Sequence, residues 1–311
     1  MSVHLLYDQA FLGHDTGEMH FEIARRLECI LASVEADADL SRRLRRTAPR
    51  PATEQDLLRC HDEMMVRGIH NFIRRGGRHL DSDTPVSENS YEIACLAAGA
   101  AITAVDTVMA EDGGRAFVLS RPPGHHATPQ RPMGFCLFNN AAVAARHAQA
   151  NHGVRNVLIV DWDVHHGNGT QDIFWRDNTV FFFSTHQYPH YPGTGDRDET
   201  GDDKGSGFTL NIPLHAGTPA RTHREAFKDA LHAIEKKFPP DLVIISAGFD
   251  SHRDDPLGNL LLEDDDFAEM TKDVLRIAEK YSNGRVVSLL EGGYNLELLG
   301  GSVRSHLAAL F

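Results

Sequence analysis

Residues 157–169 read VLIVDWDVHHGNG, and this stretch indicates the fold class most clearly. It opens with four consecutive apolar residues that favour β-structure, and it then passes directly into aspartate, histidine and glycine. A short, continuous apolar run is typical of a strand that is buried on both faces, as strands are in parallel sheets. Comparable runs occur at residues 116–120, 179–184, 208–212, 242–246 and 286–290.

Helical patterns lie between several of these runs, at residues 91–109, 139–150, 221–237 and 264–281. Strands that alternate with helices form a parallel sheet that the helices cover. We therefore expect an α/β fold in which one open, mainly parallel sheet carries helices on both faces. No repeat, low-complexity tract or convincing linker divides the chain, so we expect a single domain over residues 1–311.

The composition is that of an ordinary globular chain. Its 311 residues are 41% hydrophobic and 24% charged, which excludes collagen-like and disordered classes. The net charge of -13 argues against nucleic acid or an anionic membrane as a direct partner. Four scattered cysteines indicate a reduced, cytoplasmic protein. No apolar run approaches the roughly 18 residues that a membrane-spanning helix needs, and the oligomeric state stays open.

Polar and glycine-rich segments follow five of the predicted strands directly. They read RPPGHH at 121–126, DWDVHHGNG at 161–169, TH at 185–186, AGFD at 247–250 and EGGY at 291–294. In open α/β sheets, ligands bind beyond the carboxyl ends of the strands. One shared site at that edge explains why all five segments carry such residues.

Three of these residues have the chemistry of a metal site. Asp163 and His165 alternate along an extended segment, so both side chains point to one face, and Asp250 can supply a third ligand. Three oxygen and nitrogen ligands leave a fourth position open, which is typical of a catalytic zinc site. We predict Zn2+ here, although these ligand types also admit iron or cobalt.

The remaining strand-end residues have acid-base and hydrogen-bonding chemistry. His125 and His126 are candidates for a general base and its partner, and Asp161 and Asn168 can orient their rings. Tyr294 follows two glycines and can donate its hydroxyl to an oxyanion. Metal, water, histidine and tyrosine together can hydrolyse an amide. Each short motif alone is weak support, because strand-end carboxylates also cap helices.

The ordered motifs resemble those of the zinc-dependent histone deacetylase family. They are RPPGHHA at 121–127, GFCLFNN at 134–140, DWDVHHGNGT at 161–170, AGFD at 247–250 and EGGYNL at 291–296. Asn168 stands where class I members carry aspartate, so the chain looks like class II. Residues 49–54, 146–149 and 255–258 are similar to class IIb in particular.

This resemblance implies the arginase/deacetylase fold and the roles of the central residues. Zinc would be bound by Asp163, His165 and Asp250. His126 would be the general base and His125 the histidine beside it, with the orienting and oxyanion roles as given above. The activity implied is the removal of acyl groups from lysine.

The resemblance also implies how a substrate would be held. Phe135 and Tyr191 would line an acyl-lysine channel, with Gly134 beside them, although the family commonly has phenylalanine where Tyr191 stands. Asp83 matches a rim aspartate that holds the substrate backbone in some members. Leu257 stands where a polyamine-selective relative carries glutamate, and its apolar side chain favours acyl-lysine.

Two further expectations come from the family pattern. A structural potassium ion would be bound largely through main-chain oxygens of Asp161, Asp163, His165, Ser184 and Thr185. Residues 20–26 read HFEIARR where the family usually has His-Pro-Glu-X-Pro-X-Arg. Without the two prolines, we expect helical structure in this segment and a differently shaped rim.

The function that we predict is a zinc-dependent hydrolase acting on acylated lysine in proteins or peptides. The alternatives are an amidohydrolase of acetylpolyamines or other small acetylated amines, which the acidic charge keeps open, and a catalytically weak acyl-lysine-binding module. A two-metal ureohydrolase is disfavoured because the sequence shows no aspartates to bridge a second ion.

Overall fold

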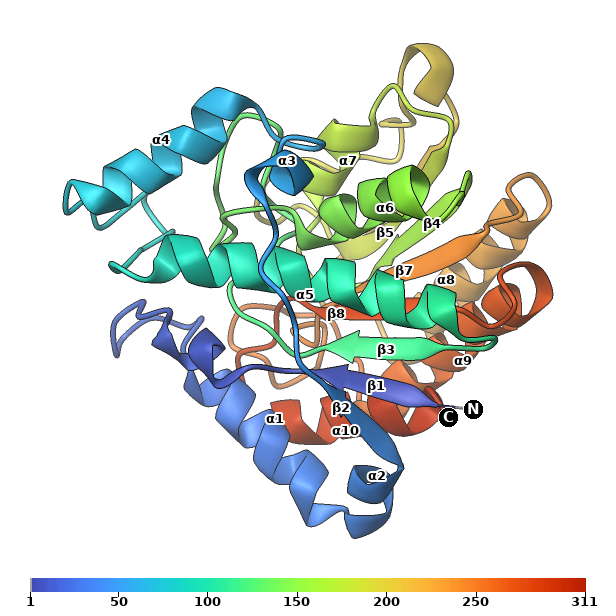
Figure 1. The fold of residues 1–311 in the computed structure, drawn as a ribbon. Helices are drawn as coiled ribbons and strands as arrows, with labels where there is room; N and C mark the ends of the chain where they lie inside the picture. Colours follow the sequence, from blue (N-terminus) through green and yellow to red (C-terminus); the bar gives the residue numbers. More distant parts are fainter. Residues whose placement is uncertain (1) are drawn as a thin grey trace.

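Eight strands form one parallel sheet at the centre of the computed structural model, which describes residues 2–311 (Figure 1). The strand order is β2-β1-β3-β8-β7-β4-β5-β6, and every pair of neighbours is parallel. The strands are β1 Val3–Leu6, β2 Leu44–Thr47, β3 Arg115–Val118, β4 Val157–Asp161, β5 Val180–Gln187, β6 Thr209–Leu214, β7 Leu242–Ala247 and β8 Val286–Leu290. The predicted α/β class and parallel sheet are confirmed.

Helices cover the two faces of this sheet. They are α1 Arg25–Ala36, α2 Ala38–Arg43, α3 Glu54–Leu57, α4 Glu63–Arg74, α5 Ser90–Ala110, α6 Asn140–Asn151, α7 Asn168–Phe174, α8 Ala220–Glu235, α9 Asp264–Tyr281 and α10 Leu299–Ala309, with 3-10 turns η1 Gln9–Gly13 and η2 Asp203–Gly205. Helices α5 and α6 pack together over one face, while α1, α10, α9 and α8 pack side by side in that order over the other (Figure 1). The expectation of helices on both faces is therefore confirmed.

Helix α5 corrects one sequence prediction. Within residues 2–311 it is the one helix whose length and composition would let it cross a membrane. In the structure, 61% of its apolar window is buried, and it packs against α6 and strands β1, β3 and β8. The statement that no such apolar run exists is therefore wrong, and packing inside the protein accounts for the apolar character of this helix.

The strand order brings the five motif-bearing segments together. Strands β3, β8, β7, β4 and β5 are consecutive neighbours in the sheet, and they are the five strands whose ends carry polar residues. Because all strands are parallel, their carboxyl ends meet at one edge. Asp161 at the end of β4 pairs in register with Ser246 of β7 and Ser184 of β5. The five segments therefore lie at the same edge of the sheet, as the prediction of one shared site requires.

Candidate active site

A buried cluster of two carboxylates and one imidazole lies at the carboxyl edge of the sheet. Asp163, His165 and Asp250 each offer one ligand atom, and these atoms all lie within 4.8 Å of one another. His165 Nδ1 lies 3.0 Å from Asp163 Oδ1 and 3.2 Å from Asp250 Oδ2. Asp250 Oδ2 is buried and has no hydrogen-bond partner. A buried carboxylate oxygen without a donor is costly, so this donor set fits a bound cation, and its nitrogen and oxygen atoms suit zinc.

The main chain fixes the two carboxylates. Asp163 Oδ2 accepts a hydrogen bond of 2.8 Å from the Gly292 N–H, and Asp250 Oδ1 accepts one of 2.8 Å from the Val164 N–H. A Cβ atom at Gly292 would lie 2.1 Å from Asp250 Oδ2 and 2.5 Å from Asp163 Oδ2. Glycine is therefore required at 292 for the backbone to approach the ligand atoms, a role that the sequence did not reveal.

Burial makes the charge state of this cluster unusual. Loss of water and the neighbouring charge of Asp163 raise the pKa of Asp250 to about 7. Burial opposes a charged His165, but the two aspartates, whose oxygens lie 3.0 Å and 3.2 Å from its Nδ1, outweigh that effect and raise its pKa to about 10. Two carboxylates crowded into a dry site favour a positive partner.

Two adjacent histidines next to this cluster have different partners. The rings of His125 and His126 lie 4.0 Å apart. His125 Nδ1 lies 2.9 Å from the carboxylate oxygen Asp161 Oδ2, whereas His126 Nδ1 lies 2.7 Å from the amide oxygen Asn168 Oδ1. Since both partners accept hydrogen bonds, each Nδ1 carries the proton and each Nε2 is left on the other side of its ring.

These partners shift the two pKa values in opposite directions. Burial disfavours a charged His125, but Asp161 and Asp163 outweigh it and raise its pKa to about 10. Burial, followed by repulsion from His125 and His165, holds the pKa of His126 well below its usual value. The pair therefore combines a charged imidazole with a neutral one.

Tyr294 lies at the same site and is held from behind. Its main-chain N–H donates to Asp255 Oδ2 at 2.7 Å, and the Arg26 guanidinium lies 4.8 Å from the centre of its ring. Burial raises the pKa of the Tyr294 hydroxyl well above its usual value, so the hydroxyl keeps its proton. Arg26 also donates to the main-chain oxygens of Glu291 and Gly293, each at 2.6 Å. The sequence analysis missed the supporting roles of Arg26 and Asp255. Both residues lie far from Tyr294 in the chain, and neither belongs to its motif.

A narrow cavity of about 80 Å³ leads to these groups. All five residues predicted to contact substrate line it, together with three from the reactive cluster: Asp83, Gly134, Phe135, Tyr191, Leu257, His126, His165 and Tyr294. The Tyr191 ring stands nearly perpendicular to His126 at 5.1 Å, and the Phe135 ring does the same to Tyr294 at 5.9 Å. Gly134 has a φ of 57°, and a Cβ there would lie 2.5 Å from His126 Cδ2. The rings of Phe135 and Tyr191 thus line a channel that His126 and His165 also line.

Three residues of the predicted potassium site lie on neighbouring strands, and Asp163 and His165 follow the end of β4. Asp161 of β4 and Ser184 of β5 are partners in register, and Thr185 follows. The hydroxyl of Ser184 bonds His186 Nδ1 at 2.9 Å, and that of Thr185 bonds His223 Nε2 at 3.0 Å. Both hydroxyls are therefore engaged within the protein, and the main-chain oxygens remain the predicted ligands.

The segment at residues 20–26 differs from its predicted form. Helix α1 begins at Arg25, so residues 20–24 are not helical and that part of the prediction is wrong. Glu22 is fully buried and accepts hydrogen bonds from Arg121 at 2.8 Å and from Arg26 at 3.1 Å. The buried ion pairs of Glu22 with these two guanidiniums hold the segment against the protein interior before α1 begins. His20 also contacts the channel, with its ring 4.6 Å from that of Phe135.

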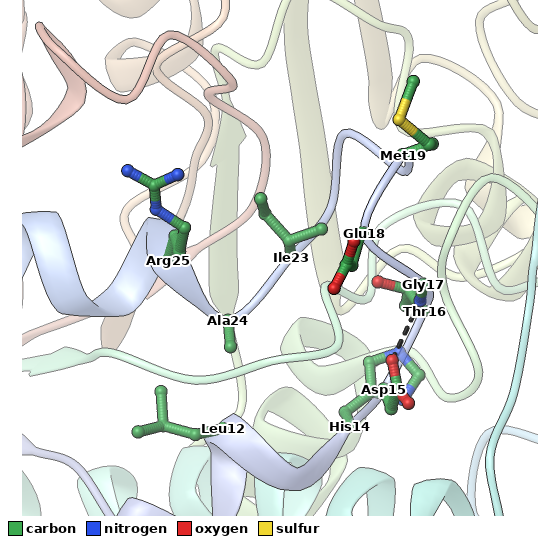
Figure 2. A pocket seen from close by; sticks show the side chains of 10 residues that line it. All are labelled: Leu12, His14, Asp15, Thr16, Gly17, Glu18, Met19, Ile23, Ala24 and Arg25. Carbon is green, nitrogen blue, oxygen red and sulfur yellow. Dashed lines mark hydrogen bonds between the residues drawn. The ribbon is translucent and has the colours of Figure 1, made fainter.

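A larger cavity of about 540 Å³ lies between residues 12–19 and residues 23–25 (Figure 2). Its lining side chains come from Leu12, His14, Asp15, Thr16, Gly17, Glu18, Met19, Ile23, Ala24 and Arg25. None of the predicted catalytic or metal-binding residues reaches it. The predicted chemistry is therefore gathered at the small channel and not at this larger hollow.

Comparisons with known proteins agree with this geometry. The histone deacetylase domain matches residues 20–310. Histone deacetylase 14, chloroplastic, of Arabidopsis thaliana is 39% identical over 98% of this chain and 76% of its own length. The histone deacetylase-like amidohydrolase of Pseudomonas aeruginosa is 41% identical over 88% of this chain and 71% of its own.

A solved structure gives the same result. The crystal structure of the HDA15 HD domain matches with a TM-score of 0.94 and 37% identity, over 99% of this chain and 88% of that chain. The match therefore extends over the sheet, its helices and the loops of the carboxyl edge. The chain belongs to the histone deacetylase family, and its similarity to named deacetylases indicates that it is a deacetylase.

Proposed function

We propose that the chain is a zinc-dependent hydrolase that removes acetyl and other acyl groups from the ε-amine of lysine in proteins or peptides. One observation carries the proposal. The buried Asp250 Oδ2 has no donor, and it lies against His165 and beside Asp163, which line or adjoin the channel. A divalent cation satisfies that oxygen and offsets the charge of the two carboxylates.

Asp163, His165 and Asp250 would hold the ion, and a zinc ion there supplies a Lewis acid that polarises the acyl carbonyl and lowers the pKa of water. His126 accepts a proton from the attacking water, because Asn168 fixes its Nδ1–H and leaves Nε2 with a free lone pair. Tyr294 donates its hydroxyl to the acyl oxygen as negative charge develops there.

The second half of the reaction needs a proton for the leaving amine. The water oxygen has by then bonded to the acyl carbon, so breaking the carbon–nitrogen bond releases acetate and leaves the lysine nitrogen to be protonated. The histidine pair supplies that proton, with Asp161 balancing the charge of His125. The overall reaction converts an amide and water into an amine and a carboxylic acid.

The channel supports a lysine substrate. Phe135 and Tyr191 offer two aromatic walls for an apolar alkyl chain, and Asp83 can accept hydrogen bonds from a peptide backbone at the rim. Leu257 presents no charge to a polyamine. The net charge of -13 is the one observation that favours a small cationic substrate instead.

We also propose that a potassium ion binds at Asp161, Asp163, His165, Ser184 and Thr185 through main-chain oxygens, as family membership and the pairing of β4 with β5 support. A cytoplasmic location is proposed on the four cysteines, which are all free thiols.

The test compares kcat/KM for an acetyl-lysine peptide and for acetylspermidine on one zinc-loaded preparation, with Tyr294→Phe as the control. We expect the peptide to be the better substrate, and we expect Tyr294→Phe to lower kcat by about a hundredfold or more, because it removes one oxyanion donor. A preference for acetylspermidine would contradict the proposed lysine substrate but not the proposed hydrolytic mechanism. Full activity in Tyr294→Phe would overturn the chemistry.

A further inference from the structure

A second group of metal-binding side chains lies at the opposite edge of the sheet. Asp106 of α5, His147 of α6 and His152 directly after α6 each offer a ligand atom within 4.8 Å of the others. Helix α5 ends before the start of β3, and α6 ends before the start of β4, so this group lies near the amino ends of the strands (Figure 1). The channel and its reactive groups lie beyond the carboxyl ends.

We propose that Asp106, His147 and His152 bind a divalent transition-metal ion of the zinc class, which ties α5 to α6. The proposal does not depend on the deacetylase chemistry. His147 Nε2 lies 2.6 Å and His152 Nε2 lies 2.7 Å from the same atom, Asp106 Oδ1. One nitrogen from α6 and one from the residue directly after it therefore meet a single carboxylate oxygen of α5.

The distances allow an ion after a small adjustment. Zinc bonds of about 2.0–2.2 Å in a tetrahedral arrangement keep ligand atoms roughly 3.3 Å apart, so each imidazole must retreat by a little more than half an ångström. His152 follows the last helical residue, and Gly153 after it has a φ of 66° with nothing within 4 Å of where a Cβ would stand. The end of α6 has room for that movement.

Two neighbours complete the site. Asn151 Nδ2 donates to His147 Nδ1 at 3.0 Å and to the main-chain oxygen of His147 at 3.2 Å, which fixes the ring with Nε2 facing Asp106. A metal ion would displace the Nε2 proton and take its place between His147 and Asp106. His152 lines a cavity of about 240 Å³ that also reaches Asp241 and Arg285. Water from this cavity can take the fourth coordination position.

Partial exposure makes such a site accessible and reversible. The Asp106 side chain is 42% exposed and that of His152 is 25% exposed, whereas His147 is buried. An ion can therefore enter without unfolding the protein, and the carboxylate needs little desolvation. Without an ion, the three side chains satisfy one another by hydrogen bonds, so we expect the protein to fold in both states.

The test titrates Zn2+ by calorimetry into protein that already holds one equivalent per chain. Wild type is compared with His152→Ala, with Asp106→Asn and with His215→Ala, a control that removes an exposed histidine elsewhere. We expect wild type and His215→Ala to bind one further equivalent, and the two cluster variants to bind it at least about tenfold more weakly. Asp106→Asn keeps the shape of the side chain, so the test remains valid if His152→Ala is poorly folded.

Two further readouts separate the two sites. The added zinc should raise the Tm of wild type and of His215→Ala but not of the cluster variants, because only a folded site binds it. Activity on an acetyl-lysine peptide should stay unchanged in Asp106→Asn. Absence of a second equivalent in wild type, or equal binding by wild type and both cluster variants, would overturn the proposal.

Discussion

The two edges of the sheet each carry three side chains that could hold a metal ion, and the two groups differ in burial and in hydrogen bonding. At the carboxyl edge, Asp163, His165 and Asp250 are all buried, and one carboxylate oxygen has no donor. At the amino edge, Asp106 and His152 are partly exposed, and every imidazole contact to Asp106 is a normal hydrogen bond. The first group leaves a buried oxygen that a cation would satisfy, whereas the side chains of the second group pair with one another.

The backbone around each group shows the same difference. Cβ atoms at Gly248 and Gly292 would lie 2.2 Å and 2.1 Å from the carboxylate oxygens of Asp163 and Asp250, respectively. At Gly153, near the second group, a Cβ would meet nothing within 4 Å. The main chain is packed closely around the carboxyl-edge cluster and loosely around the other. Tight packing holds ligands in one geometry, so we expect essential chemistry at the first edge and optional binding at the second.

The largest difference in activity is expected between a substitution in the carboxyl-edge cluster and one in the amino-edge cluster. Asp250→Ala should lower kcat/KM for an acetyl-lysine peptide by more than about a hundredfold, since even residues behind metal ligands cost ten- to a hundredfold in affinity or activity. Asp106→Asn should leave it unchanged. The comparison is measured by steady-state kinetics with bound metal counted for each variant. Equal loss in both variants would break the distinction between the edges.

The second prediction concerns charge and stability. Burial opposes ionisation of Glu22, but Arg121 and Arg26 outweigh it and hold its pKa at about 2, below the usual 4.5. Because the folded pKa is depressed, its stabilisation is complete above pH 4.5 and is lost as pH falls towards 2. Glu22→Gln should therefore cost roughly 3 kcal/mol at pH 7 and remove that part of the acid sensitivity.

The matched control is at the amino edge. Asp112 is 91% exposed and pairs with Arg285 at 3.2 Å, so Asp112→Asn should leave the free energy of unfolding nearly unchanged. Urea unfolding at pH 7 and pH 4 measures both variants. If the two substitutions destabilise the protein equally, burial is not what distinguishes the ion pairs at the two edges.

A smaller effect is expected at the channel entrance. Leu257→Glu adds a negative charge beside the channel and should raise kcat/KM for acetylspermidine relative to the peptide by about tenfold, since a carboxylate attracts a nearby cation by roughly 1 kcal/mol or more. Leu257→Gln is the control for size and polarity without charge. An equal shift in both variants would show that charge at 257 does not select the substrate.

Local sequence patterns predicted most of the sheet and the reactive residues. The helix at 264–281 and the strand at 286–290 have the same bounds in the structure, because each has a continuous pattern of its own type. Strand β2 was missed because two of its four residues, LRRT, are arginines. Only its leucine is buried, so the strand has no apolar run. The motifs at the strand ends were recognisable because each motif is contiguous.

Features made by distant residues were not predictable. Glu22 and Arg121 are 99 residues apart, and Asp106 lies 41 and 46 residues from His147 and His152. No local period or motif links such residues, since only the packing of separate elements brings them together. The same holds for Gly292, whose required lack of a side chain follows from the position of Asp250 across the site.

The most direct test of the account measures activity with and without metal. Protein stripped by a chelator is assayed on an acetyl-lysine peptide before and after one equivalent of Zn2+ is added, in wild type and in Asp106→Asn. The account predicts that both proteins lose activity on stripping and regain it with that single equivalent. Full activity in the stripped protein, or no recovery with zinc, would contradict the claim that the buried carboxyl-edge cluster works through a zinc ion.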